Sequence, residues 1–482
     1  MYESGGNADS SSTEPMRIAM CCDFFYPRLG GVEMHIWSLS QCLLRRGHKV
    51  IVITHQTDGP DKRQGIRYMT NNLKVYYLPL VPMVDNVTLP TFTAGFGLFR
   101  TVLIRERIQI VHGHQATSAF MHECILQAKT MGYKAIYTDH SLFGFADAAS
   151  IHLNKVMKFT LSDIDHAICV SHTCKENLVL RASLDPSIVS TIPNAVDASK
   201  FTPSTTSATT PSPPLDPLRD PITVVIISRL VYRKGIDLVG KTIELVCARC
   251  PNVKFLIGGD GNKRLLLEEM REKCQLHDRV TLWGAVPHEQ VRHVLNQGHI
   301  FLNSSLTESF CIAILEAAAC GLFVVSTRVG GVPEVLPPDM IRFSKDITPE
   351  DLADAVVESI PLLAKVDKQN FHNRVEKMYN WYDVAERTER VYRNVVQLPT
   401  PPLIHRFRKY YGMGPVAGIL GCTIAACLFL YLQYLEWLKP STDIEVALDI
   451  PSTDWTDRER RHHPKTSTLH ETKHAVVETS QR

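Results

Sequence analysis

The sequence has no excess of charge of either sign. Among its 482 residues, 52 Lys and Arg stand against 50 Asp and Glu, which leaves a formal net charge of +2. A protein that binds nucleic acid through its phosphates presents a basic field, and this composition supplies none. The balance therefore argues against nucleic acid as a partner.

The sequence also lacks the cysteine pattern of a metal site. Its thirteen cysteines are odd in number and mostly occur in apolar segments, which indicates small core residues in a reducing compartment. Cys247 and Cys250 have the spacing of two metal ligands, but no second pair follows, and both lie in a helical pattern that begins near Ile236. We interpret them as structural.

A long apolar run is missing at the amino end. Residues 1–15 are rich in Ser, Gly and Glu and are predicted to be disordered. The first apolar run, residues 18–22, is interrupted by Asp23 and is too short for the core of a secretory signal. We therefore expect the amino terminus to stay in the cytosol.

One long uncharged segment does occur, near the other end. Residues 410–435 contain no Asp, Glu, Lys, Arg or His, which predicts a single transmembrane helix over residues 414–435, after a juxtamembrane stretch at 399–413. The cations before this segment are Arg390, Arg393, Arg406, Arg408 and Lys409, whereas only Lys439 stands in the twenty residues after it. The positive-inside rule places the amino-terminal part in the cytosol and residues 436–482 across the membrane.

Short β-branched runs alternate with amphipathic stretches in two successive cycles, which indicates parallel βαβ units. The predicted strands are 18–22, 50–54, 75–80, 108–112, 135–138 and 167–170, then 222–228, 253–258, 280–283, 300–303, 324–327 and 341–343. We therefore expect an α/β protein with two Rossmann-like doubly wound domains, 16–200 and 222–370, facing a cleft. A Pro/Ser/Thr-rich linker or loop, 201–221, joins the domains, and residues 371–398 are predicted to form bracing helices.

Ligands of such sheets bind beyond the carboxyl ends of the strands, where two turns stand out. Gly30 and Gly31 follow the first strand and allow backbone amides to approach an anion, although a tight left-handed turn also requires glycine. Arg229 and Lys234 follow the first strand of the second cycle. A guanidinium and an ammonium in a strand-to-helix turn suit a diphosphate, and a solvated loop is the alternative.

Glu308 and Glu316 lie eight residues apart around a run that carries no other charge. On one continuous helix they would be separated by about 80° and about 12 Å, so they could not serve one small group from one face. If the helix begins near Ser309 and Phe310, Glu308 precedes it, Glu316 lies two turns inside, and the free amides of residues 309–311 offer a phosphate cradle. The helix is otherwise apolar, so Glu316 should be buried with ligand hydroxyls or a cation, or else reach solvent at an edge.

His140 ends the fifth predicted strand and is expected at the mouth of the cleft as a polar contact or proton donor, although an isolated histidine is more often structural. Asp163 and Asp165 have the spacing of a metal-binding DxD motif. They precede a strand instead of following one, so we do not assign them to a metal.

Several motifs together carry a family resemblance over most of the chain, from about Arg17 to the apolar segment: DFFYPRLGGVEMHI, TDHSLFGFAD, IPNAVD, SRLVYRKGIDL, ESFCIAILEAAACG and STRVGGVPEVLP. With the E-x7-E pair Glu308 and Glu316, they resemble the GT-B retaining glycosyltransferases of family 4. Within that group they are similar to the catalytic subunits of phosphatidylinositol N-acetylglucosaminyltransferases, which begin glycosylphosphatidylinositol (GPI) anchor synthesis at the endoplasmic reticulum.

The resemblance implies transfer of N-acetylglucosamine from UDP-GlcNAc to phosphatidylinositol with retention and without metal or other cofactor. It implies Glu308 and His140 as catalytic residues and the following binding roles: Arg229, Lys234, Gly30 and Gly31 for the diphosphate, Glu316 for the ribose, and Phe310 and Cys311 with Glu308 for the donor sugar and β-phosphate. It further implies an endoplasmic reticulum membrane protein with a cytosolic catalytic part, a lumenal tail, and other subunits of a GPI-GlcNAc transferase complex as partners.

Three alternatives remain at this point: another family-4 enzyme with a different sugar or acceptor, a GT-B-fold sugar-nucleotide epimerase, and a non-catalytic scaffold. An epimerase has no need of a membrane helix, and a scaffold has no need of the diphosphate contacts. The stretch Thr91–Ile108 either dips into lipid headgroups or forms an ordinary core helix. The linker is longer than usual for the family, and the two ends of the chain match it little.

Overall fold

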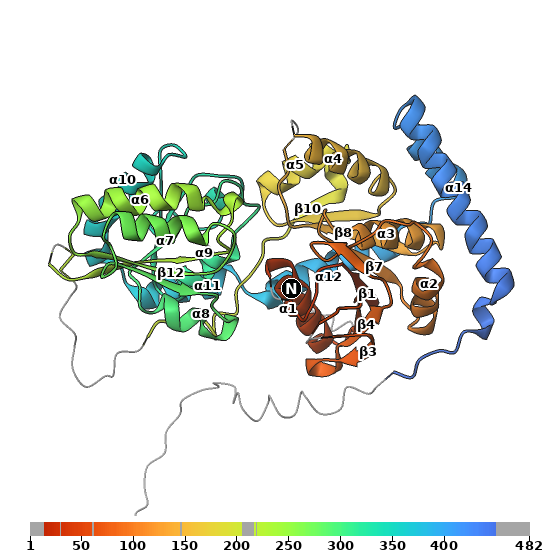
Figure 1. The fold of residues 1–482 in the computed structure, drawn as a ribbon. Helices are drawn as coiled ribbons and strands as arrows, with labels where there is room; N and C mark the ends of the chain where they lie inside the picture. Colours follow the sequence, from red (N-terminus) through yellow and green to blue (C-terminus); the bar gives the residue numbers. More distant parts are fainter. Residues whose placement is uncertain are drawn as a thin grey trace, which may run out of the picture.

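The computed structural model describes residues 14–28, 30–59, 62–144, 147–204, 216–217 and 219–449. They form two lobes, each a parallel sheet covered by helices (Figure 1). We call residues 14–204 the N-lobe and residues 216–378 the C-lobe. Three predicted regions lie wholly or partly outside the described residues: residues 1–13 of the disordered start, most of the linker, and the end of the tail.

The N-lobe sheet has eight strands in the order β10-β9-β8-β7-β1-β2-β4-β3, all parallel except the pair β3 and β4. Its elements are β1 Arg17–Cys21, α1 Gly31–Arg45, β2 Lys49–His55, β3 Gly65–Tyr68, η1 Thr70–Asn72, β4 Lys74–Leu78, β5 Pro82–Val84, β6 Val87–Thr88, α2 Phe96–Arg105, β7 Ile110–His114, α3 Ala119–Thr130, β8 Lys134–Asp139, α4 Ala148–Thr160, β9 His166–Cys169, α5 His172–Ala182, η2 Pro186–Ile188 and β10 Val189–Thr191. The central strands are buried on both faces, as their continuous apolar runs require.

The C-lobe sheet has six parallel strands in the order β13-β12-β11-β14-β15-β16. Its elements are β11 Ile222–Ile227, η3 Tyr232–Lys234, α6 Ile236–Arg249, β12 Val253–Gly258, α7 Arg264–Lys273, β13 Val280–Gly284, α8 His288–Leu295, β14 Ile300–Asn303, α9 Ile312–Ala319, β15 Phe323–Ser326, η4 Val332–Glu334, β16 Ile341–Phe343, α10 Pro349–Ser359, η5 Ile360–Lys365 and α11 Lys368–Met378. All twelve predicted strands are therefore present, within about two residues of their expected ends.

The chain returns to the N-lobe after α11. Helix α11 packs beside α9, whereas α12 (Trp381–Gln397) packs along α1 and gives Val384, Val391 and Tyr392 to the N-lobe core. Helix α13 (Leu403–Tyr411) is tied to the lobe by an ion pair between Arg406 and the buried Asp163. The Asp163 carboxylate thus has a structural partner, and Asp165 likewise pairs with Lys129.

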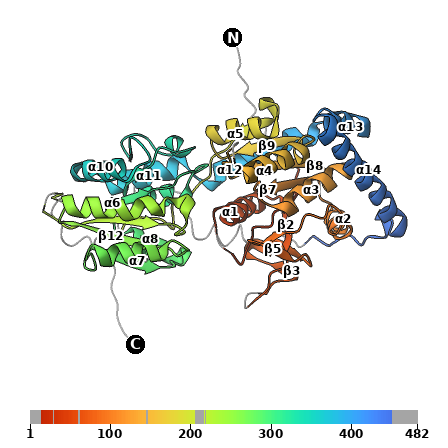
Figure 2. The same cartoon turned by 45° about the horizontal axis from the view of Figure 1, so that its top comes forward.

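Helix α14 (Pro415–Leu438) is the one helix of the described residues that is long and apolar enough to cross a membrane. In Figures 1 and 2 it runs along the outer side of the N-lobe, next to α2 and α3. Phe96 and Leu126 pack against its inner face, and Arg100 of α2 pairs with Glu436 near its end. Its outward apolar side chains, such as Leu430 and Trp437, stay exposed.

The segment after α14 turns back to the N-lobe and includes η6 (Ser441–Asp443). Its Asp449 carboxylate pairs with Arg17, Lys49 and Arg107. A helix that crosses the bilayer carries the following residues to the other side, so these ion pairs and a crossing α14 are mutually exclusive.

Candidate active site

The Glu316 carboxylate occupies one wall of a gap between the lobes. Glu316 lies on α9 and, with Ile312, lines a pocket of about 610 Å³ whose other walls come from α1, α12 and the chain between Ala195 and Phe201. No donor among the described residues bonds this carboxylate, and burial raises its pKa to about 7. An unpaired carboxylate out of bulk water is costly, so a ligand that brings two hydroxyl groups would satisfy it.

Lys234 and Glu308 form an ion pair at the carboxyl edge of the C-lobe sheet. Glu308 also accepts a hydrogen bond of 2.8 Å from the Ser305 hydroxyl, and Ser304 donates to the Lys234 carbonyl at 2.7 Å. Burial lowers the pKa of Lys234, but the nearby Glu308 carboxylate outweighs it and leaves the pKa above its usual value. The ammonium is therefore charged at neutral pH and held in place by the first E-x7-E carboxylate.

Gly235 lets these two residues approach each other. It adopts a φ of +69°, and a Cβ built there would lie 1.8 Å from the Ser304 carbonyl oxygen. Only glycine fits this position, because any side chain would push η3 away from the loop that carries Glu308.

Arg229, the other expected diphosphate cation, is exposed in the same gap. It lies within electrostatic reach of Lys234 in its own lobe and of Glu33 in the N-lobe. Arg233, between the two, contacts the N-lobe instead: its guanidinium lies 5.7 Å from the centre of the Phe143 ring. Arg229 and Lys234 therefore lie at the gap, whereas Arg233 contacts the N-lobe.

The start of α9 differs from the sequence prediction. The helix begins at Ile312 and not near Ser309, because Cys311 takes a left-handed conformation with a φ of 76°. A left-handed cysteine is uncommon, and such outliers cluster where a ligand is held. Phe310 is buried with its ring against Tyr379, so it can offer a ligand only its backbone.

The pKa of the Cys311 thiol shows which charged side chains lie near the start of α9. Burial, together with the charges of Glu308 and Glu316, raises its pKa to about 12 against the opposing charge of Lys234. All three charged side chains therefore surround the start of α9. A thiol with so high a pKa is neutral and does not act as a nucleophile.

Gly30 and Gly31 open α1 on the N-lobe side of the gap. Gly30 is extended, with a φ of −161°, and neither glycine has a positive φ, so a left-handed turn does not explain them. A Cβ on Gly31 would meet nothing within 4 Å, whereas one on Gly30 would lie 2.6 Å from a Glu33 carboxylate oxygen. Glu33 thus folds back over the free amides that begin α1, where an anion would otherwise bind.

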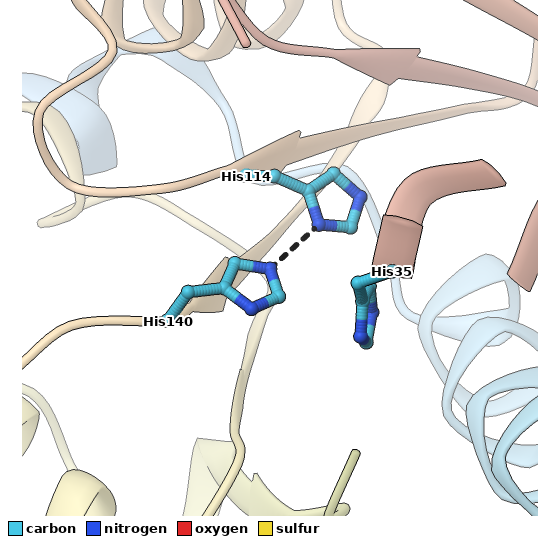
Figure 3. A group of neighbouring side chains, drawn as sticks. All are labelled: His35, His114 and His140. Carbon is cyan, nitrogen blue, oxygen red and sulfur yellow. Dashed lines mark hydrogen bonds between the residues drawn. The ribbon is translucent and has the colours of Figure 1, made fainter. Parts of the chain in front are cut away.

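His140 stands in a group of histidines on the same wall, shown in Figure 3 with His35 of α1 and His114 of β7. His114 Nδ1 and His140 Nε2 share a hydrogen bond of 3.2 Å, and His35 Nδ1 bonds the Asn194 side chain at 2.7 Å. Burial lowers the pKa of His35 to about 4, and burial and neighbouring imidazoles lower the pKa values of His114 and His140 well below that of a free imidazole. The three rings are therefore neutral at pH 7.

These histidines are also the described residues that could hold a metal ion, since one nitrogen of each lies within 4.8 Å of the others. However, His114 and His140 bond each other directly, and His35 is already oriented by Asn194. Neutral rings that donate and accept hydrogen bonds also suit the hydroxyl groups of a sugar. We interpret the cluster as a polar wall of the gap.

The two lobes touch next to this wall. The Ser309 hydroxyl donates to the His140 carbonyl at 2.5 Å, and the Ser171 hydroxyl donates to the Ser309 carbonyl at 2.7 Å. Glu334 of the C-lobe accepts hydrogen bonds from the first amides of α5, those of His172 and Thr173. The segment that carries Glu308 is thus supported from both lobes.

Sequence reasoning missed the residues that support this segment. A Cβ on Gly330 would lie 2.0 Å from the Glu308 carbonyl oxygen, and one on Gly331 would lie 2.1 Å from that of Ser309. The glycines of STRVGGVPEVLP therefore let two loops pack backbone to backbone. The motif was visible in the sequence, but its partner loop was not.

Solved structures identify the class of this fold. Sucrose-phosphate synthase from Thermosynechococcus elongatus matches with a TM-score of 0.62 at 20% identity, over 79% of this chain and 99% of that one. HepE from Anabaena, solved in complex with UDP, matches with a TM-score of 0.60 at 13% identity, over 79% of this chain and 100% of that one. The molecule has the GT-B glycosyltransferase fold, as the sequence predicted.

Sequence comparison is more specific. Residues 55–147 match the family described as PIGA (GPI anchor biosynthesis), and residues 213–370 match glycosyl transferases group 1. The chain is 53% identical over 435 residues to a phosphatidylinositol N-acetylglucosaminyltransferase subunit of Arabidopsis thaliana, covering 90% of this chain and 94% of that one. The corresponding subunit of Homo sapiens is 48% identical over 462 residues, which cover 94% of this chain and 92% of that one.

The chain therefore belongs to the PIGA family of phosphatidylinositol N-acetylglucosaminyltransferase subunits and is a glycosyltransferase of GPI-anchor biosynthesis. The resemblance that the sequence motifs indicated is confirmed.

Proposed function

We propose that this chain transfers N-acetylglucosamine from UDP-GlcNAc to the inositol of phosphatidylinositol, with retention of configuration. The observation that carries the proposal is the arrangement around the start of α9. There the unpaired Glu316 carboxylate and the Lys234–Glu308 pair lie around Cys311, and the neighbouring Ser309 contacts the His140 carbonyl of the other lobe. The names of the relatives supply the sugar and the lipid.

Each part of the donor has a matching group in this arrangement. Glu316 lacks a partner and accepts the two ribose hydroxyls, which are its natural complement. Lys234 and Arg229 provide the charges for the diphosphate, and the amides that begin α1 face it once Glu33 has moved aside. His140 and Glu308, one from each lobe, bound the position of the donor sugar.

Retention without a protein nucleophile requires substitution on one face of the sugar. The bond between the anomeric carbon and the β-phosphate oxygen breaks, the inositol oxygen bonds to that carbon on the same face, and its proton passes to the departing phosphate. Lys234 and Arg229 stabilise the charge that develops on this phosphate. No step uses a metal ion, and we expect chelation of divalent cations to leave the rate unchanged.

An assay of the complete enzyme in membranes tests the donor and the acceptor. UDP-GlcNAc and phosphatidylinositol should yield an α-linked N-acetylglucosaminyl product, whereas UDP-glucose and GDP-mannose should not. Lys234→Ala should lower product formation about a hundredfold or more while membrane integration persists. A β-linked product would overturn retention, and preferential use of another sugar nucleotide would overturn the donor assignment.

We further propose that α14 anchors the chain once in the endoplasmic reticulum membrane, with the lobes in the cytosol and the tail lumenal, beside other subunits of a GPI-GlcNAc transferase complex. The length and apolar outer face of α14 and the excess of cations before it support this orientation. In that state Asp449 leaves Arg17 and Lys49. A glycosylation acceptor introduced near the end of the chain should be modified; an unmodified acceptor would mean that the tail stays on the N-lobe as in the structure.

A further inference from the structure

A hairpin on the N-lobe exposes four apolar side chains to water. It spans residues 81–89, with β5 paired to β6, and its exposed fractions are 60% for Val81, 67% for Met83, 70% for Val84 and 56% for Leu89. Single exposed apolar residues are common on protein surfaces, but a cluster of this size in nine residues marks a contact surface.

The exposure does not arise from a loose loop. The Thr88 amide donates a hydrogen bond of 3.0 Å to the buried Asp23 carboxylate, which also accepts from the Ser118 hydroxyl and the Phe120 amide. His55 bonds the Asn86 carbonyl at 2.9 Å. The hairpin is therefore held with its apolar side chains outward.

The same carboxylate connects the hairpin to the active-site gap. Asp23 begins the loop that leads to Gly30 and Gly31, and Tyr26 of that loop accepts a hydrogen bond from the Tyr77 hydroxyl just before the hairpin. The guanidinium of Arg63 lies 5.4 Å from the centre of the half-exposed Tyr26 ring. An aromatic ring and a cation thus lie between the hairpin and the gap, a combination suited to lipid headgroups.

Helix α2 itself does not form the lipid contact. Its Phe99, Val102 and Leu103 side chains are buried in the N-lobe core and Phe96 is covered by α14, which favours the core-helix interpretation of Thr91–Ile108. The hairpin and α2 both fall within residues 55–147, the part that matches the GPI-anchor family and not the general glycosyltransferase family.

We propose that the hairpin of residues 81–89 inserts its apolar side chains into the surface of the membrane in which α14 anchors the chain. This contact holds the acceptor side of the gap against the bilayer. The inference rests on the proposed function in that the acceptor is a membrane lipid. The membrane contact itself has a readout that needs no turnover.

Photocrosslinking gives that readout. A benzophenone amino acid placed at Val84 of the full chain, in vesicles of phosphatidylcholine with phosphatidylinositol, should form adducts with lipid. The matched control is Leu180 on α5, which is 67% exposed and should form none. Adducts with another protein subunit in native membranes, or no lipid adduct in vesicles, would overturn the proposal.

Kinetics of the double variant Met83→Ser, Val84→Ser supply the second arm. Its apparent KM for phosphatidylinositol in vesicles should rise about tenfold or more, because two apolar side chains no longer enter the lipid. Its rate with a short-chain, water-soluble phosphatidylinositol should match that of the unaltered protein, as should Leu180→Ser with both acceptors. An unchanged vesicle KM would refute the hairpin's role. A lipid adduct without any glycosylated product would instead refute the proposed function.

Discussion

Replacing Glu316 with Gln should stabilise the protein and, at the same time, weaken its binding of UDP. Burial raises the carboxyl pKa from 4.5 to about 7, which corresponds to about 3 kcal/mol of destabilisation at a pH above both values. The folded state binds the proton more tightly than the unfolded state, so stability is full below pH 4.5 and falls as the pH rises to about 7. Glu316→Gln removes this dependence.

The measurement is a pair of thermal melts without ligand. At pH 8 the melting temperature of Glu316→Gln should exceed that of the unaltered protein, whereas at pH 5 the two should differ little. UDP affinity should change in the opposite direction. Hydrogen bonds to a charged group contribute about 1.5–3 kcal/mol, so calorimetry should find UDP binding about ten- to a hundredfold weaker in the variant.

Glu376→Gln is the matched control, because Glu376 lines the same pocket but is exposed. It should change neither the melting temperature nor the affinity. Equal melts of Glu316→Gln and the unaltered protein at pH 8 would show that the carboxylate is not desolvated. An unchanged UDP affinity would show that the ribose does not lie at Glu316.

Three further substitutions test the rest of the site. Lys234→Ala removes a diphosphate charge and leaves Glu308 unpaired, so kcat should fall about a hundredfold or more with an unchanged fold by circular dichroism. Cys311→Gly relieves the φ of 76°, so the free energy of unfolding should rise by up to about 1 kcal/mol in denaturant titrations, whereas a drop would contradict the strain. Gly331→Ala places a methyl 2.1 Å from the Ser309 carbonyl and should lower activity about tenfold or more in the same membrane assay; full activity would mean that the loops can separate without harm.

The buried strands could be predicted because parallel strands covered on both faces leave continuous apolar runs. The edges of the N-lobe sheet left no such signal. All four residues of β3 are exposed, and its pairing is antiparallel, so neither an apolar run nor a crossover helix announces it. The strands β5 and β6 are too short for a periodic pattern, and β5 exposes the apolar side chains of Met83 and Val84.

The site was predictable where one chemical group implies another. Two carboxylates and two cations after buried strands indicate an anionic ligand with hydroxyl groups, and the structure gathers Glu308, Glu316 and Lys234 around one helix start. Geometry across the lobes was not predictable. His35 lies on a helix that looks ordinary in sequence, and only the fold brings it to His140. The later helix start after Cys311 also depends on the packing of the loop and not on local propensity.

The hydrogen bonds that join Ser309 to Ser171 and His140 couple the loop that carries Glu308 to the relative position of the two lobes. Glu308 lies one residue before Ser309, so the N-lobe supports the C-lobe loop that carries this candidate site residue. Separation of the lobes would break both hydrogen bonds and leave this loop without its support from the N-lobe. If Glu308 acts as we propose, an open molecule would bind the sugar nucleotide without hydrolysing it, and transfer would require the closed arrangement of the lobes.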